Sequence, residues 1–229
     1  MIFASIESIP NNDIIINNYK TKEDIMKITF VIMDCYDEST FERCMQSISL
    51  QTVENWEVLV VGQREISEIT AEGITAKYIT CADDVSVMLE SALDNANGEF
   101  ICFVDSIHCF SPFFGEKMSD MCADADMAAC GYVGIQRNTL LSQVGVPLMM
   151  YKPETMISDE YMVKCTEGSV VSVGMHNYFE NKLYRRSVLE NCRPLVDENT
   201  DETGIVQKIV KNCGNVAFTD EPMLFVCME

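Results

Sequence analysis

The sequence predicts a single α/β domain in which helices flank a mostly parallel central sheet. Three observations predict this class. The chain has 229 residues, a length that suits one large domain. Short apolar runs alternate with amphipathic helical segments over residues 27–133. Strands that alternate with helices in this way usually pair in parallel through right-handed crossovers.

Several apolar runs predict the strands of this sheet. They are short, rich in β-branched residues and nearly free of polar ones, as expected for strands that are covered on both faces. The predicted strands are Ile28–Met33, Glu57–Val61, Lys77–Thr80, Glu99–Val104 and Asp126–Val133.

Helices are predicted between these strands. Ser39 and Glu42 have the spacing of a capping box, so Ser39 is expected to cap the first helix. Gly98 is expected to end the second helix by adopting a positive φ, and Ser111-Pro112 to open the third. The predicted inward faces are Phe41, Cys44, Met45 and Ile48 in the first helix, and Val85, Met88, Leu89, Ala92, Leu93 and Ala96 in the second.

The second half of the chain is less regular. Residues 134–168 lack a clean periodicity and are expected to be rich in loops, and Gly168–Gly174 is expected to be a strand. A helix is predicted over Asp201–Asn212, followed by strands at Val216–Phe218 and Met223–Cys227. Residues 1–26 form a polar N-terminal extension in this interpretation.

Charge and cysteine content restrict the partners and the location. The formal net charge is -20, with 16 basic against 36 acidic residues, which disfavours nucleic acid as a partner. None of the 11 cysteines forms a C-x-x-C pair, and many lie in apolar runs. This usage predicts a reduced, cytoplasmic protein. No segment has the roughly 18 apolar residues of a transmembrane helix, and the start does not resemble a signal peptide.

Polar residues gather where the predicted strands end. These ends are residues 34–37, residues 62–64 and residues 105–108. Open parallel sheets bind ligands at the carboxyl ends of their strands, so these segments are the candidate binding site.

Four stretches resemble family 2 glycosyltransferases. In order they are ITFVIMDCYDESTFERCMQSISLQTVENWEVLVV, NANGEFICFVDSIHCFSP, NKLYRRSVLE and DENTDETGIVQKIVKNCGNVAFTDEPMLFV. The resemblance spans residues 27–228 and implies a GT-A-type, Rossmann-like domain over 27–229. Within it, 27–133 would be the nucleotide-binding half and 134–229 the acceptor-side half.

The resemblance implies transfer of a sugar from a nucleotide-diphosphate sugar, of UDP type, to a hydroxyl group of a glycan or other acceptor, with inversion. Tyr36, Asp37 and Asp105 would lie beside the nucleotide. A strand-end aspartate binds the uracil edge in the family, but Gly62 or Gln63 occupies that position here, and an amide such as that of Gln63 can still hydrogen-bond a base.

The metal motif of the family is also altered. Asp105 keeps its first aspartate, Ile107 stands at the second position and cannot ligate, and His108 follows. Asp105 and His108 are therefore the candidate ligands for Mn²⁺ or Mg²⁺, since imidazole can bind Mn²⁺. The alternative is that His108 is a loop histidine with no ligand.

The catalytic base implied by the resemblance falls at Asp201 or Glu202, where a carboxylate would take the proton of the acceptor hydroxyl. These acids could instead complement the dipole at a helix start. Arg185 and Arg186 could clamp a diphosphate or pair with surface acids, and His176 could be a late metal ligand or an ordinary polar residue. Because two ligand positions are altered together, a catalytically impaired binding or assembly module is the alternative function.

Overall fold

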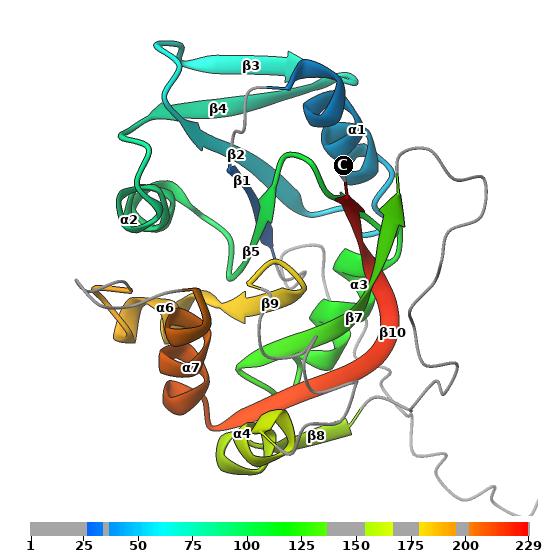
Figure 1. Ribbon diagram of the computed structural model, residues 1–229, viewed down its shortest axis with the longest axis vertical. Coiled ribbons are helices and arrows are strands. Elements are labelled where there is room, and N and C mark those ends of the chain that lie inside the picture. Colours follow the sequence, from blue (N-terminus) through cyan, green and yellow to red (C-terminus); the bar gives the residue numbers. More distant parts are fainter. Residues whose placement is uncertain (1–26, 34–36, 137–153, 167–178, 196–201, 229) are drawn as a thin grey trace, which may run out of the picture.

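The computed structural model describes residues 27–33, 37–136, 154–166, 179–195 and 202–228, which form one domain around a ten-stranded sheet (Figure 1). The strands are β1 (Ile28–Met33), β2 (Trp56–Gly62), β3 (Glu68–Ala71), β4 (Ile74–Thr80), β5 (Phe100–Asp105), β6 (Cys109–Phe110), β7 (Met127–Gln136), β8 (Glu154–Ile157), β9 (Lys182–Arg185) and β10 (Asn215–Met228). The helices are α1 (Glu38–Ser49), α2 (Val85–Asn95), α3 (Phe114–Met121), α4 (Ser158–Thr166), α6 (Arg186–Asn191) and α7 (Glu202–Asn212).

The sheet is mixed, and the strands from the first half of the chain are mainly parallel. Its strand order is β3-β4-β2-β1-β5-β9-β7-β10-β6, and β8 pairs with β10. The strands β4, β2, β1 and β5 are all parallel, which confirms the predicted fold class. β9 is antiparallel to both of its neighbours, β5 and β7, and β7 pairs in parallel with β10.

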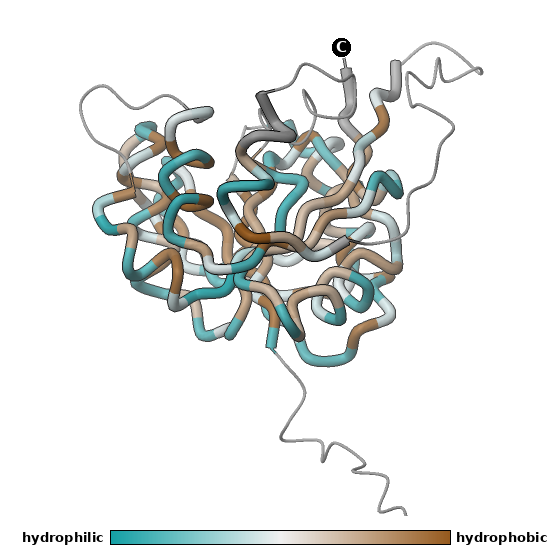
Figure 2. The backbone as a smooth tube through the Cα atoms, turned by 90° about the horizontal axis from the view of Figure 1, so that it is seen from below, coloured by the Kyte–Doolittle hydropathy of each residue, from teal (hydrophilic) through white to brown (hydrophobic). Residues whose placement is uncertain are grey.

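Each face of the sheet carries its own hydrophobic core, because alternate residues of the central strands point in opposite directions. On β1, Val31 belongs to the cluster that includes residues of α2 and α7, whereas Phe30 belongs to the cluster that includes residues of α1 and α3. Figure 1 shows the helices divided in this way, with α2, α6 and α7 gathered on one side. Hydrophobic colours run through the middle of the domain in Figure 2, and hydrophilic ones dominate its outer turns. No described helix is long and apolar enough to cross a membrane.

The start of α1 differs from the prediction. Asp37, not Ser39, is the N-cap: its Oδ1 accepts hydrogen bonds from the backbone N–H of Ser39 (2.9 Å) and of Thr40 (3.1 Å). The Asp37 carboxylate satisfies orphan amides one half-turn before those that Ser39 would cap, so the helix begins before the predicted capping box. The inward face of α1 is confirmed, since Phe41, Cys44, Met45 and Ile48 are all buried.

One further helix boundary and one inward-facing residue were also predicted wrongly. α3 begins at Phe114, after Ser111-Pro112, because the Pro112 carbonyl accepts a hydrogen bond from the Thr52 N–H (2.9 Å) instead of starting the helix. On α2, Val85 is 43% exposed at the first position, so it does not share the inward face.

Gly98 has a different role from the one predicted. It does not take a positive φ; Gly73 is the glycine in the described residues that does. Gly98 instead lies against β1, where a Cβ would be 2.6 Å from Thr29 N and 2.7 Å from the Phe100 carbonyl oxygen. Glycine is required here by close backbone approach.

The second half contains more regular structure than the sequence predicted. β8 and α4 fall within 134–168, and β10 is one long strand whose register with β7 shifts between Phe218 and Leu224, where two strands were expected. The predicted strand Gly168–Gly174 lies outside the described residues. The helix over 201–212 is confirmed as α7, with Ile205, Ile209 and Val210 buried.

A polar latch closes the amino edge of the sheet. Glu57 on β2 accepts hydrogen bonds through Oε1 from Thr29 Oγ1 (2.7 Å) and from the Asn97 N–H (2.7 Å), and its Oε2 lies 2.6 Å from Lys27 Nζ. Burial by itself raises the pKa of Glu57, but the hydrogen bonds from Lys27, Thr29 and Asn97 outweigh it and hold the pKa below its ordinary value. The latch therefore joins β1, β2 and the turn into β5 through one carboxylate.

We expect Glu57→Gln to lower the free energy of unfolding by about 1–2 kcal/mol at neutral pH, because three donors lose a charged acceptor. The folded-state pKa lies below the ordinary 4.5, so this stabilisation is fully present above that value and is lost as pH falls through the folded-state pKa. Urea unfolding of both proteins at neutral pH and at about pH 3 would test this. A gap in stability that does not narrow in acid would contradict the assignment.

Candidate functional site

The carboxyl ends of the parallel strands meet in register. Met33 at the end of β1 lies opposite Val61 of β2 on one side and Asp105 of β5 on the other. Gly62 in turn lies opposite Thr80, the last residue of β4. The Ser106 N–H donates to the Met33 carbonyl (3.1 Å), which extends the pairing of β1 and β5 past Asp105. The predicted binding edge is therefore a continuous line of strand ends.

Asp105 and His108 are brought together by a tight turn. The His108 N–H donates to the Asp105 carbonyl (3.0 Å). Asp105 Oδ1 and His108 Nδ1 are buried, and neither has a hydrogen-bond partner among the described residues. Burial lowers the pKa of His108, although the charge of Asp105 and a backbone hydrogen bond act in the opposite direction. Buried polar atoms normally have hydrogen-bond partners, so Asp105 Oδ1 and His108 Nδ1 are candidate contacts for a ligand.

The described residues contain no group of three or more His, Cys, Asp or Glu side chains that could hold a metal ion. A cation at this edge would therefore have one carboxylate oxygen and one imidazole nitrogen from the described protein. These two donors suit Mn²⁺ better than Mg²⁺, which prefers oxygen ligands.

Two of the other predicted nucleotide-binding residues follow the ends of β1 and β2. Asp37 is exposed after β1, but its Oδ1 is engaged in capping α1. Gln63 is exposed directly after β2. The following loop is fixed by β4, since the Arg64 N–H donates to Tyr78 Oη (3.1 Å) and Thr80 Oγ1 donates to the Arg64 carbonyl (2.6 Å). Tyr36 lies outside the described residues.

Asp201 and also His176 lie outside the described residues, and Glu202 is described as the first residue of α7 by its backbone alone.

Arg185 and Arg186 lie at the opposite edge of the sheet, so a diphosphate clamp at the candidate site is the wrong interpretation. Arg185 is paired with Phe100, the first residue of β5, whereas Asp105 is the last. Its guanidinium contacts Glu99 (2.6 Å) and donates to the carbonyls of Cys122 and Ala125. A depression of about 550 Å³ lined by Asn97–Glu99, Arg185–Ser187 and Glu190 belongs to this edge.

A buried polar segment beside β5 was missed by sequence reasoning. Glu180, Asn181 and Lys182 are 9%, 0% and 0% exposed, at and just before the start of β9. Lys182 Nζ donates to Asn181 Oδ1 (2.7 Å), and Asn181 Nδ2 donates to the Cys130 carbonyl (2.5 Å). Because β9 is antiparallel to β5, the residues at and before its start lie toward the end of β5 that carries Asp105. The signal available in the sequence was Asn-Lys directly before an apolar pair, which was read only as a family motif.

The sequence and the fold were compared with those of known proteins. No family model matches the chain. A putative glycosyltransferase, EpsH of Bacillus subtilis, is 27% identical over 173 residues, which cover 71% of this chain and 48% of EpsH. Crystal structures of TarS 1-349 from S. aureus superpose with a TM-score of 0.62 in complex with UDP and 0.63 in complex with UDP-GlcNAc. This chain has the TarS fold. The match covers 89% of this chain and 61% or 59% of the TarS chains, at 16% identity.

The likeness to TarS concerns the fold, because identity at this level does not carry residue roles. The chain spans about half the length of EpsH and about three fifths of TarS 1-349. The predicted α/β class with a mostly parallel sheet and flanking helices is confirmed by both the strand pairing and this superposition.

Proposed function

We propose that this chain is a glycosyltransferase domain that transfers a sugar from a nucleotide-diphosphate sugar of UDP type to a hydroxyl acceptor, with inversion. One observation carries the proposal. At the aligned strand ends, Oδ1 of Asp105 is buried and has no hydrogen-bond partner among the described residues. Support comes from the shared fold with TarS, which binds UDP and UDP-GlcNAc, and from the likeness to EpsH.

Asp105 Oδ1 and His108 Nδ1 would hold a divalent cation in this proposal. Both atoms are buried and lack partners among the described residues, so they fit a shared ligand. When bound, such a cation would neutralise the charge of the diphosphate leaving group. We favour Mn²⁺ over Mg²⁺ because one of the two ligands is an imidazole.

The proton of the acceptor would go to a carboxylate at the start of α7, Asp201 or Glu202. The acceptor oxygen would form its bond to the anomeric carbon on the face opposite the diphosphate, while the bond from that carbon to the diphosphate breaks. Attack from the opposite face inverts the configuration. Glycans are the acceptor class proposed.

The domain organisation and location complete the proposal. Residues 27–133 would form the nucleotide-binding half of the domain and 134–229 the acceptor-side half, with 1–26 as an extension. A cytoplasmic location is supported by eight cysteines of the described residues that are free thiols.

Calorimetric titration with UDP tests the donor site. We expect binding that requires Mn²⁺ in the wild type and is lost in Asp105→Ala, because the ligand oxygen at the strand end is removed. His108→Ala should weaken Mn²⁺-dependent binding by about tenfold, the loss of one of two protein ligands. Asp124→Ala, an exposed aspartate between α3 and β7, is the matched control and should bind like the wild type. Equal binding with and without Mn²⁺ would contradict the metal assignment.

A catalytically impaired binding or assembly module is the second candidate. It is favoured by Gly62-Gln63 and Ile107, which replace two ligand positions of the resembled family. The same titration separates the candidates, since a wild type that binds no nucleoside diphosphate with any divalent cation favours the second. If the wild type transfers sugar and the Asp201→Asn variant does not, the second candidate function is excluded.

A further inference from the structure

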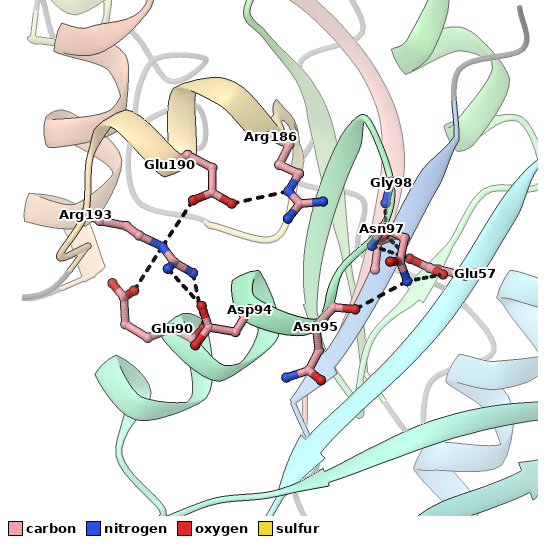
Figure 3. Close-up of polar contacts among 10 residues, drawn as sticks. Glu57, Glu90, Asp94, Asn95, Asn97, Gly98, Arg186, Glu190 and Arg193 are labelled. Carbon is pink, nitrogen blue, oxygen red and sulfur yellow. Dashed lines mark hydrogen bonds and ion pairs between the residues drawn. The ribbon is translucent and has the colours of Figure 1, made fainter.

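Arg193 connects two helices from different halves of the chain. It follows α6 and lies against α2, where its Nη1 is 2.8 Å from Asp94 Oδ1 and its Nε is 3.2 Å from Glu90 Oε2. Its Nε is also 3.5 Å from Glu190 Oε2 on α6. Figure 3 shows the guanidinium between these three carboxylates. Arg193 therefore reduces the repulsion among these three carboxylates where α2 and α6 meet.

The same junction holds the main chain that leads toward α7. The Leu195 N–H donates to Glu90 Oε1 (2.7 Å), so both oxygens of Glu90 are used on residues 193–195. Lys208 Nζ of α7 donates to the Pro194 carbonyl (2.5 Å). Leu195 is fully buried in the cluster that also contains Leu89 of α2 and Ile205 of α7. Residues 193–195 are thus fixed to α2 on one side and to α7 on the other.

We propose that Arg193 and Glu90 are positioning residues that set where α7 begins relative to α2. This inference rests on the proposed function, in which the start of α7 carries the general base. α2 is itself anchored near the donor edge, since its N-cap Asp84 follows β4, whose last residue Thr80 lies opposite Gly62. The clamp made by Arg193 and Glu90 therefore relates the acceptor-side helix to the nucleotide side of the sheet.

The clamp is better suited to position α7 than to stabilise the whole domain. Arg193 and Glu90 are 29% and 30% exposed, and partly exposed ion pairs contribute little to the free energy of unfolding. Removing the guanidinium would take from Glu90 and Asp94 the cation that bridges them to α6, while Glu190 keeps its pair with Arg186, and the repulsion between α2 and α6 would loosen the junction locally.

The test compares Arg193→Met and Arg193→Lys with Arg186→Met. Arg186 pairs with Glu190 at 3.3 Å within α6 and is the matched control. Amide hydrogen exchange over residues 202–208, kcat and the donor KM are measured for each protein. For Arg193→Met we expect exchange in that segment to rise about tenfold, and kcat to fall about tenfold to hundredfold with the donor KM little changed. Lysine should restore part of both, and Arg186→Met should match the wild type.

Three results would overturn the inference. The first is unchanged exchange over 202–208 in Arg193→Met. The second is exchange that rises equally in β1 and α7, which would indicate a purely global loss of stability. The third is a donor KM that rises with kcat unchanged. If the wild type transfers no sugar, the proposed function fails, and the exchange measurement alone still decides whether Arg193 positions α7.

Discussion

Replacing Gly98 with alanine is expected to lower the free energy of unfolding by about 3 kcal/mol or more, which is at the upper end of overpacking costs. The added Cβ would lie 2.6 Å from both Thr29 N and Thr29 Oγ1 and 2.7 Å from the Phe100 carbonyl oxygen. Two of these atoms are backbone of the central strands β1 and β5, so relief requires the strands to move apart. Thermal unfolding should show a decrease in Tm of roughly 6–12 °C for a domain of this size.

Gly73→Ala is the matched control for this prediction. Gly73 has φ +77 in the β3–β4 turn, with no atom within 4 Å of an added Cβ. Its replacement should therefore cost only the backbone strain of about 1 kcal/mol. Comparable losses at the two positions would mean that close strand approach is not what requires glycine at position 98.

The second large effect is expected for Asp105→Asn, which should reduce kcat for sugar transfer by about 10²–10³-fold. The substitution keeps the size of the side chain but removes the charge of the oxygen that lies buried and unpartnered among the described residues. Initial rates with a UDP-sugar donor and Mn²⁺ would measure it. The fold should persist, because the side chain makes no described hydrogen bond that the variant would lose.

Asp124→Asn is the control for activity, since Asp124 is exposed and remote from the strand ends. Far-UV circular dichroism should match the wild type for both variants. If Asp105→Asn has the wild-type kcat, Asp105 takes no part in the reaction, and the proposed donor site at the strand ends loses its main residue.

The parallel core of the fold was predictable because its residues are buried on both faces. The first five residues of β5 are apolar and buried, and this leaves an uninterrupted apolar run in the sequence. β9 was not predictable in the same way. It has four residues, including the buried Lys182, and its hydrogen-bond partners Phe100 and Met127 are distant in the chain. Tertiary pairing decides such a strand, and local pattern does not.

The residues of the candidate site could be predicted from the sequence where they directly follow a predicted strand. Asp105, His108 and Gln63 follow predicted strands, and the register of β2, β1 and β5 aligns those ends. The capping role of Asp37 was not predictable from spacing, because aspartate caps helices as well as serine does and the capping-box spacing indicated Ser39. The buried pairing of Lys182 with Asn181 also required the structure, since Asn181 in turn donates to the Cys130 carbonyl of β7, which is 51 residues away in the chain.

The insertion of β9 between β5 and β7 has a consequence for synthesis of the protein. β5 and β7 are separated in the sheet by a strand that ends at residue 185, and β10 completes the sheet only with the last residues. As the chain leaves the ribosome, β1, β2, β4 and β5 can pair among themselves, but the open edge of β5 waits for about 80 further residues at roughly 5–20 residues per second. An apolar strand whose edge is still unpaired can form hydrogen bonds with strands of other chains. Nascent chains that stall between β5 and β9 should therefore be the species that depends most on chaperones, whereas the completed domain has this edge covered.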